Sequence, residues 1–337
     1  MRVRQRGFLG GHPRSAARQR PRRSSFEPAP GSHSALPPPR LAPESARATP
    51  GTARSVGRKG SFLLGSTAMR VAVVQLNTQD DLAANLERVR HWIAHAAAGG
   101  AQLVALPENF AYMGEEARRR ELAERLDGVF PGPILLALSE SASKHGVWVL
   151  GGGMPERSED AARPYNTALL VDPRGEIVAT YRKLHLFDVT VPDGTSYRES
   201  ATTTPGAEVV TAEVLGVRMG LSICYDVRFP ELFRRLSDEG ARVVAVPAAF
   251  TIPTGKDHWH PLLRARAIEN QVFVLAPAQH GKHPRGRQTY GKSLIVDPWG
   301  EVMAQCSEGE GFAVATLDFA YQDRVRTALP SLLHRKF

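Results

Sequence analysis

The sequence predicts an α/β protein built as a four-layer α-β-β-α sandwich, and three observations lead to this fold class. From residue 69 onwards, short apolar runs of strand length alternate with amphipathic helical segments. A strand, an Asp-Pro-x-Gly turn and a second strand occur once in each half of the chain. The short apolar runs Leu103–Leu106 and Val243–Val246 form a second repeat, and each leads into a proline. Two similar halves, each a sheet with helices on one face, predict two sheets packed face to face with the helices outside.

The first half alternates strands and helices. A buried strand is expected at Arg70–Leu76, and an amphipathic helix at Asp81–Ala98, where apolar residues recur at helical spacing until two glycines end it. The remaining predicted elements of this half are strands at Leu103–Leu106 and Val147–Leu150, helices near Glu115–Leu126 and at Ile134–Lys144, and a hairpin at Ala168–Ala179.

The second half begins with an apolar run that ends in Ser222-Ile223-Cys224. Arg228-Phe229-Pro230-Glu231 follows and is typical of a helix start, so the pattern predicts a strand, a sharp turn and a helix, with a cysteine at the turn. Backbone N–H groups near such a turn favour negative charge on the thiol. The other predicted elements are strands at Val243–Pro247, Val272–Ala276 and Phe312–Leu317, a helix at His260–Asn270 and a hairpin at Ser293–Ala304.

The charge of the chain is concentrated in its first 68 residues. They carry thirteen basic and two acidic residues, a formal charge of +11, whereas the rest of the 337-residue chain carries −2. The basic character therefore gives no support to a nucleic-acid surface on the folded part. We expect residues 1–68 to be a disordered basic extension, because their composition buries too little apolar surface to offset the entropy of ordering, and residues 69–337 to form the folded domain.

Three interpretations of residues 1–68 remain open. They are an Arg-rich organelle transit peptide, a disordered tail that touches RNA or membrane, or an upstream extension of the reading frame. We favour the third, with the true start at Met69, because a strand begins there at once. This predicts a cytoplasmic protein, whereas a genuine transit peptide would place it in mitochondria.

The composition also limits the class of protein. The two cysteines, Cys224 and Cys306, provide no disulfide framework and indicate a reducing compartment. The chain has no metal-ligand spacing of Cys and His and no apolar run of membrane-spanning length. We therefore expect no metal, no membrane segment and no nucleic-acid partner.

Three reactive side chains each follow a predicted strand: Glu108, Lys183 and Cys224. Residues just beyond strand ends converge on the functional site of α/β folds. A thiol, a carboxylate and an ammonium in one pocket suit acyl transfer, in which the thiol attacks a carbonyl, the carboxylate takes the thiol proton and the ammonium stabilises the oxyanion. Taken singly, each has an ordinary structural interpretation: a loop acid, a surface lysine and a buried cysteine. Their occurrence together at three strand ends favours catalysis.

The chain from residue 69 to the end resembles the nitrilase, or carbon–nitrogen hydrolase, superfamily. The motifs that carry the resemblance are PENF, YRKLHLFD, ICYDVRFPE and RARAIENQVFV, in that order. The resemblance implies the α-β-β-α sandwich, assembly into dimers or larger homo-oligomers, no cofactor, and Glu108, Lys183 and Cys224 as the catalytic set. It further implies that Glu199 orients the lysine, although an ordinary loop acid is the alternative.

Within this superfamily, the chain resembles most the Nit branch of deaminated glutathione amidases. The matching segments are Phe187-Asp188-Val189, Thr254–Trp259, Ala278–His283, Gln288–Gly291 and the tail Leu329–Arg335. The resemblance implies hydrolysis of a 2-oxoglutaramyl amide through a thioester, giving 2-oxoglutarate and cysteinylglycine. The alternatives are an ω-amidase acting on 2-oxoglutaramate or 2-oxosuccinamate, and another carbon–nitrogen hydrolase with a nitrile or carbamoyl substrate.

A substrate of this kind is a small amide that carries a carboxylate, and Arg228 is the residue expected to bind that carboxylate. Arginine binds carboxylates through two parallel N–H bonds, and Arg228 lies four residues after the predicted nucleophile. A structural arginine paired with Asp226, Glu231 or a backbone carbonyl is an equal alternative. The backbone N–H of Tyr225 is expected to join Lys183 at the oxyanion. The other predicted pocket walls are Phe110, Tyr112, Phe250, Thr254 and His258.

Two other classes of protein compete with the enzyme. One is a binding protein that keeps the fold and has lost the chemistry, which the intact set of three reactive residues disfavours. The other is a nucleic-acid binder that acts through the Arg-rich tail.

Overall fold

The computed structural model describes residues 68–127, 131–191 and 194–336. The extension predicted at residues 1–68 lies outside these ranges except for its last residue. Within them, no helix is both long enough and apolar enough to cross a lipid bilayer.

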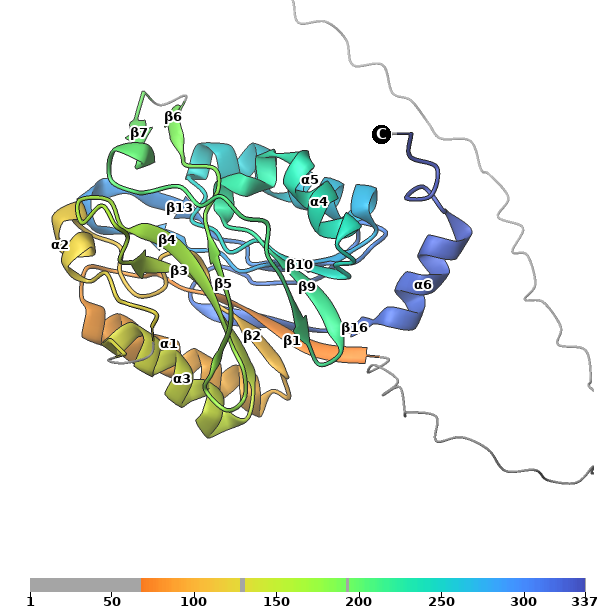
Figure 1. The fold of residues 1–337 in the computed structure, drawn as a ribbon, viewed down its shortest axis with the longest axis horizontal. Helices are drawn as coiled ribbons and strands as arrows, with labels where there is room; N and C mark the ends of the chain where they lie inside the picture. The colour runs from red at the N-terminus through yellow and green to blue at the C-terminus, as the bar shows by residue number, and fades with distance from the viewer. Residues whose placement is uncertain (1–67, 128–130, 192–193, 337) are drawn as a thin grey trace, which may run out of the picture. The chain divides into compact units, whose positions relative to one another are not determined.

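Two six-stranded sheets form the centre of the fold (Figure 1). The first has the order β16-β1-β2-β3-β4-β5 and the second the order β15-β14-β11-β10-β9-β8. The strands of the first sheet are β1 (Ala68–Gln75), β2 (Leu103–Ala105), β3 (Trp148–Glu156), β4 (Tyr165–Val171), β5 (Ile177–Arg182) and β16 (Gly311–Asp318). Those of the second are β8 (Thr211–Val214), β9 (Val217–Leu221), β10 (Val243–Ala245), β11 (Phe273–Ala276), β14 (Leu294–Val296) and β15 (Val302–Gln305).

The two sheets have the same internal pattern, as the sequence repeat predicts. In each, three parallel strands (β1, β2, β3 or β9, β10, β11) are followed by an antiparallel hairpin. The two hairpins share one turn: Asp172 Oδ1 accepts from the backbone N–H groups of Arg174 and Glu176, and Asp297 Oδ1 accepts from the N–H groups two and four residues further on. The glycine of each turn, Gly175 or Gly300, has a positive φ (85° and 90°). The turn sequence therefore sets the same local structure twice.

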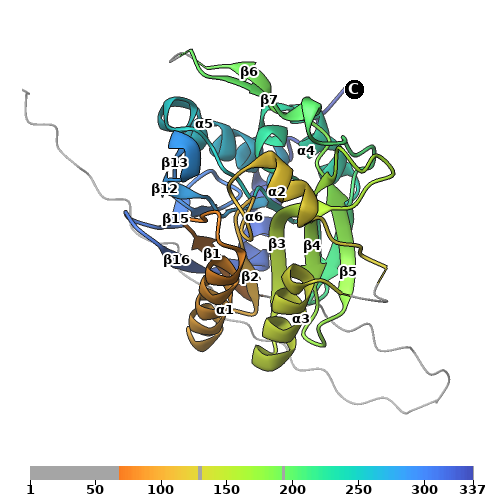
Figure 2. The same cartoon turned by 90° about the vertical axis from the view of Figure 1, so that its left-hand side faces the viewer.

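Helices cover the outer face of each sheet, which gives the four layers (Figures 1 and 2). Helices α1 (Leu82–Ala98) and α3 (Pro133–His145) pack on the first sheet, whereas α4 (Pro230–Asp238) and α5 (Ile252–Asn270) pack on the second. Alternate residues of a strand point to opposite faces. Val71 and Val73 accordingly belong to the cluster between the sheets, while Ala72 and Val74 belong to the cluster beneath α1 and α3. The predicted α/β sandwich is confirmed.

The remaining elements are short and lie around these layers. They are α2 (Glu116–Glu121), the hairpins β6–β7 (Asp188–Thr190, Ser196–Arg198) and β12–β13 (His280–Lys282, Gln288–Tyr290), the 3-10 turns η1 (Glu199–Ala201), η2 (Cys224–Arg228) and η3 (Pro284–Gly286), and the C-terminal helix α6 (Phe319–Ala328).

Some element boundaries differ from those predicted. The helix expected near Glu115–Leu126 ends at Glu121, because Glu124 leaves the helical path and its carboxylate accepts from the N–H groups of Ile134 and Leu135 (2.7 and 2.9 Å), capping α3. Helix α5 begins at Ile252 rather than His260, with a proline in its first turn, where proline needs no N–H partner. Strand β3 extends through its three glycines to Glu156 instead of ending before them.

Candidate active site

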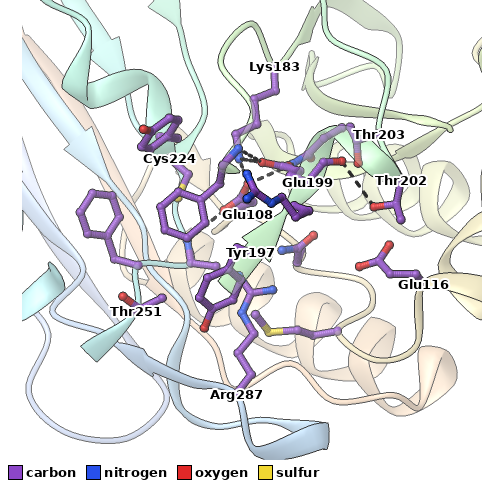
Figure 3. A pocket seen from close by; sticks show the side chains of 18 of the residues that line it. Glu108, Glu116, Lys183, Tyr197, Glu199, Thr202, Thr203, Cys224, Thr251 and Arg287 are labelled. Carbon is purple, nitrogen blue, oxygen red and sulfur yellow. Dashed lines mark hydrogen bonds and ion pairs between the residues drawn. The ribbon is translucent and has the colours of Figure 1, made fainter. Parts of the chain in front are cut away.

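Three strand ends bring Glu108, Lys183 and Cys224 into one buried cluster (Figure 3). Strands β2 and β5 of the first sheet run in the same direction, because two antiparallel pairings separate β5 from β3, so Glu108 and Lys183 emerge at the same edge. Cys224 follows β9 of the second sheet. The site therefore forms where the two sheets meet, and neither half alone contains it.

The ammonium of Lys183 sits between two carboxylates. Its Nζ lies 2.9 Å from Oε1 of Glu108, and 3.1 and 2.9 Å from the two oxygens of Glu199. Burial alone lowers the pKa of a lysine, but the two carboxylates more than reverse this effect and hold the pKa of Lys183 above its ordinary value. The ammonium is therefore charged at neutral pH, which suits it to stabilise negative charge and not to exchange protons.

The carboxylate of Glu108 is fixed from several sides. It accepts from Lys183, from Nδ2 of Asn166 at 2.9 Å and from the backbone N–H of Ala249 at 3.1 Å. Burial raises the pKa of this carboxyl, but the adjacent ammonium outweighs burial, so the pKa lies below its ordinary value. Glu108 is thus an ionised base that cannot rotate away from the thiol.

Cys224 adopts a left-handed backbone conformation, with φ of 49°. Its N–H donates to the carbonyl of Pro247 at 2.8 Å, and the charge of the Glu108 carboxylate acts on its thiol. Burial and the charge of Glu108 raise the pKa of Cys224 well above its usual range. The sequence suggested that nearby N–H groups favour the thiolate, but burial dominates here. The resting cysteine is a neutral thiol against an ionised base, which is the arrangement that general-base activation requires.

Asp226 holds the turn that carries the nucleophile. Its buried carboxylate accepts from the hydroxyl of Tyr181 (2.7 Å), from the N–H of Ile223 (2.8 Å) and from the N–H of His185 (3.0 Å). Its Oδ1 also lies 2.7 Å from Nδ1 of the same histidine. These contacts tie the turn after β9 to the end of β5, which positions Cys224 relative to Lys183.

A cavity of about 280 Å³ opens above these groups. Of the residues that the sequence predicted for it, Glu108, Lys183, Glu199 and Cys224 line it, and so do Tyr112, Tyr225, Arg228, Phe250 and Thr254. Arg228 Nη1 lies 3.3 Å from Nδ1 of His258, and the guanidinium carbon lies 5.3 Å from the centre of the Phe250 ring. Among the described residues no carboxylate pairs with it, so the alternative of an ion pair with Asp226 or Glu231 is wrong.

Two of the predicted wall residues do not line the cavity. Phe110 is fully buried in the cluster beneath α1 and α3, where its ring lies against Gly151. Its apolar ring has no polar atom to satisfy, so it packs into the core. His258 is not among the residues that line the cavity, and it contacts the lining residue Arg228.

The structure adds residues that the sequence did not single out. Asn166, which is buried, donates to both Glu108 and Glu199 (2.9 and 3.4 Å). Arg119, Tyr197 and Arg287 line the cavity from three separate segments. A polar asparagine within the apolar run of β4 was a usable signal for the first, whereas nothing local marked the others. In the part of the chain that the structure describes, no group of three or more His, Cys, Asp or Glu side chains is placed to hold a metal ion.

Comparison with known proteins agrees with this geometry. The family model for carbon-nitrogen hydrolases matches residues 70–327. The chain belongs to the carbon–nitrogen hydrolase family. A curated deaminated glutathione amidase of Synechocystis is 46% identical to this carbon–nitrogen hydrolase over 270 residues, which cover 79% of this chain and 97% of the relative.

Two solved structures are similar in fold and sequence. The Caenorhabditis elegans NitFhit protein is 40% identical with a TM-score of 0.75, over 81% of this chain and 66% of that one. Saccharomyces cerevisiae Nit3, described as a member of branch 10 of the nitrilase superfamily, is 33% identical with a TM-score of 0.73, over 82% of this chain and all of the yeast chain. These likenesses agree with the fold and with the Nit branch.

Proposed function

We propose that this carbon–nitrogen hydrolase cleaves the amide bond of deaminated glutathione, releasing 2-oxoglutarate and cysteinylglycine. The observation that carries the proposal is a neutral thiol of Cys224 held against the ionised carboxylate of Glu108, with the charged ammonium of Lys183 beside them. The Synechocystis relative, which carries this substrate in its name, supports the choice of amide.

In the first half of the proposed reaction, Cys224 attacks the amide carbonyl carbon while Glu108 takes the thiol proton. Negative charge moves to the carbonyl oxygen, where the ammonium of Lys183 and the backbone N–H of Tyr225 stabilise it. The tetrahedral intermediate collapses by breaking the C–N bond, and Glu108 passes its proton to the leaving nitrogen. The acyl group remains on sulfur as a thioester.

In the second half, water replaces the leaving amine. Glu108, again ionised, takes a proton from this water while the water oxygen attacks the thioester carbonyl carbon. The C–S bond breaks, sulfur recovers its proton from Glu108, and the carboxylic acid leaves. Glu199 keeps Lys183 in place through both halves, because its oxygens accept from Nζ and from the backbone N–H of Phe187 at 2.7 Å.

Arg228 is proposed to bind the α-keto carboxylate of the substrate. Arg228 belongs to the same 3-10 turn as Cys224, and no carboxylate in the described part of the chain forms an ion pair with its guanidinium group. Phe250 and Thr254 also line the cavity and supply an apolar wall and a hydroxyl. Arg228→Lys is expected to raise KM for acids, because a point charge replaces a planar fork.

The test is a substrate panel with two cysteine variants. Purified protein is assayed with deaminated glutathione, 2-oxoglutaramate and a simple nitrile, and intact-mass spectrometry looks for the acyl adduct. Cys224→Ala is expected to lower kcat by on the order of 10⁴-fold or more. Cys306→Ala is the matched control, because this buried cysteine lies outside the cavity. Turnover by Cys224→Ala, or preference for the nitrile or for 2-oxoglutaramate over deaminated glutathione, would contradict the proposal.

The assembly state is part of the same proposal. The resemblance to the superfamily implies a homodimer or a larger homo-oligomer, formed independently of the substrate. Size-exclusion chromatography with light scattering measures the mass directly, and a monomer at micromolar concentration would contradict it.

A further inference from the structure

Arg287 is a cavity arginine that has no carboxylate partner in the described part of the chain. It lies between η3 and β13 and lines the active-site cavity. Its Nε is buried and has no hydrogen-bond partner, and its guanidinium carbon lies 5.9 Å from the centre of the Tyr197 ring. Figure 3 shows Arg287 beside Tyr197, with Lys183 entering the site from the opposite direction. Among the described residues no carboxylate forms an ion pair with Arg287.

Neighbouring arginines are already satisfied, so Arg287 differs from them. Arg119 donates to Thr203 at 3.3 Å and lies 3.9 Å from a carboxylate oxygen of Glu116. Arg285, at the rim, pairs with Glu115 at 3.2 Å. A partly buried guanidinium without a counter-ion is costly, because its lost hydration is not replaced. An anion supplied from solution would remove that cost.

Arg287 also lies where the active-site cavity meets a second cavity. A second cavity, of about 490 Å³, adjoins the first, and the two share Met113, Gly114, Glu116, Tyr197 and Arg287 as walls. A substrate that reacts at Cys224 and is longer than the inner cavity extends past this shared wall. Arg228 and Arg287 are therefore two cavity arginines without carboxylate partners, one on the turn of the nucleophile and one at the junction with the outer cavity.

Deaminated glutathione matches this pair of cations. The scissile amide has an α-keto carboxylate on its acyl side, and the cysteinylglycine leaving group ends in a second carboxylate. 2-Oxoglutaramate has only the first. Resting on the proposed function, we propose that Arg287 binds the carboxylate of the leaving group and thereby selects a dipeptide amide over a simple ω-amide. The facing acids are Glu116, which is shared with Arg119, and Glu108, which is held by Lys183.

The test compares three substrates that differ in the leaving group: deaminated glutathione, its C-terminal carboxamide and 2-oxoglutaramate. Arg287→Gln is expected to lower kcat/KM for deaminated glutathione about 10- to 100-fold through KM, because a charge-assisted contact is lost. The values for the other two substrates are expected to change less than about twofold, which also shows that the variant is folded. Arg287→Lys should keep part of the preference, because it keeps the charge but not the fork.

Arg118→Gln is the matched control. Arg118 lies on α2, which contributes to the wall of the outer cavity, but it is exposed and pairs with Glu121 at 2.7 Å. Its replacement therefore changes the net charge without removing a residue that is proposed to bind the substrate. It should leave the ratio between the three substrates unchanged. Equal losses on all three substrates, or none, in Arg287→Gln would overturn the inference while an active wild-type enzyme upholds the proposed function. A wild-type enzyme inactive on deaminated glutathione would overturn both.

Discussion

Gly152 is the position where the two halves of the active site touch, and replacing it with alanine should separate them. A Cβ at residue 152 would lie 2.1 Å from the carbonyl oxygen of Leu106, 2.4 Å from Cβ of Pro247 and 2.7 Å from the carbonyl carbon of Pro107. Leu106 and Pro107 lead directly to Glu108. The carbonyl of Pro247 accepts the N–H of the nucleophilic cysteine at 2.8 Å. The added methyl group would therefore act as a wedge between the base and the nucleophile.

The size of the effect follows from these distances. Ordinary contacts of a Cβ begin near 3.4 Å, so the atoms on each side must move by about 1 Å. A misplacement of about 1 Å in a catalytic group costs about 100-fold in rate. Forcing a methyl group into a filled core also costs about 1–3 kcal/mol of folding free energy. We expect Gly152→Ala to lower kcat about 100-fold and to remain folded.

The assay measures kcat at saturating substrate, together with the free energy of unfolding from urea titration. Gly311→Ala is the control, because a Cβ there meets no atom within 4 Å and the residue has no positive φ. It should change the free energy of unfolding by less than about 1 kcal/mol and leave kcat unchanged. If Gly152→Ala keeps wild-type kcat and stability, the close approach of the two loops does not determine the catalytic geometry.

Three further predictions concern single groups. Asp226→Asn should lower the free energy of unfolding by about 3 kcal/mol in urea titration. Whichever way the new amide is oriented, the backbone N–H of either Ile223 or His185 loses its acceptor. A loss below about 1 kcal/mol would contradict the role of this carboxylate. Burial raises the pKa of both cysteines, but Cys224 lines the cavity beside the base Glu108, whereas Cys306 lies outside the cavity. Iodoacetamide at pH 8 should therefore label Cys224 first, and equal labelling in the native protein by peptide mass spectrometry would count against it. Burial raises the pKa of Glu108, but Lys183 more than reverses this effect, so kcat/KM should fall with acid only below the ordinary pKa of 4.5. The stabilisation of the fold by the Glu108–Lys183 pair should likewise be present above pH 4.5 and be lost as the pH falls through the lower pKa of the folded state. An acidic limb of kcat/KM near neutral pH would contradict the assignment.

The predicted elements that the structure reproduces best are those set by local chemistry. Both Asp-Pro-x-Gly hairpins form as predicted, because the aspartate of each turn satisfies N–H groups only two and four residues away. The short strands before Glu108 and Cys224 are largely apolar and end at a proline or a turn, so their limits are visible in the sequence. Conversely, the helix near Glu115 ends early because Glu124 caps another helix, which no local pattern reveals.

The same division applies to the active site. The sequence by itself determined that a carboxylate, an ammonium and a thiol follow three strands, because each of these positions depends on its own segment. Only the tertiary structure decided that Tyr112 faces the cavity while Phe110 enters the core, and that Arg287 reaches the cavity without a counter-ion from the described residues. It also decided the protonation states, since the pKa values of Glu108 and Cys224 depend on burial and on charges brought from distant strands. Burial and charge pairing are properties of the packed sheets, and they are set by residues that lie far apart along the chain.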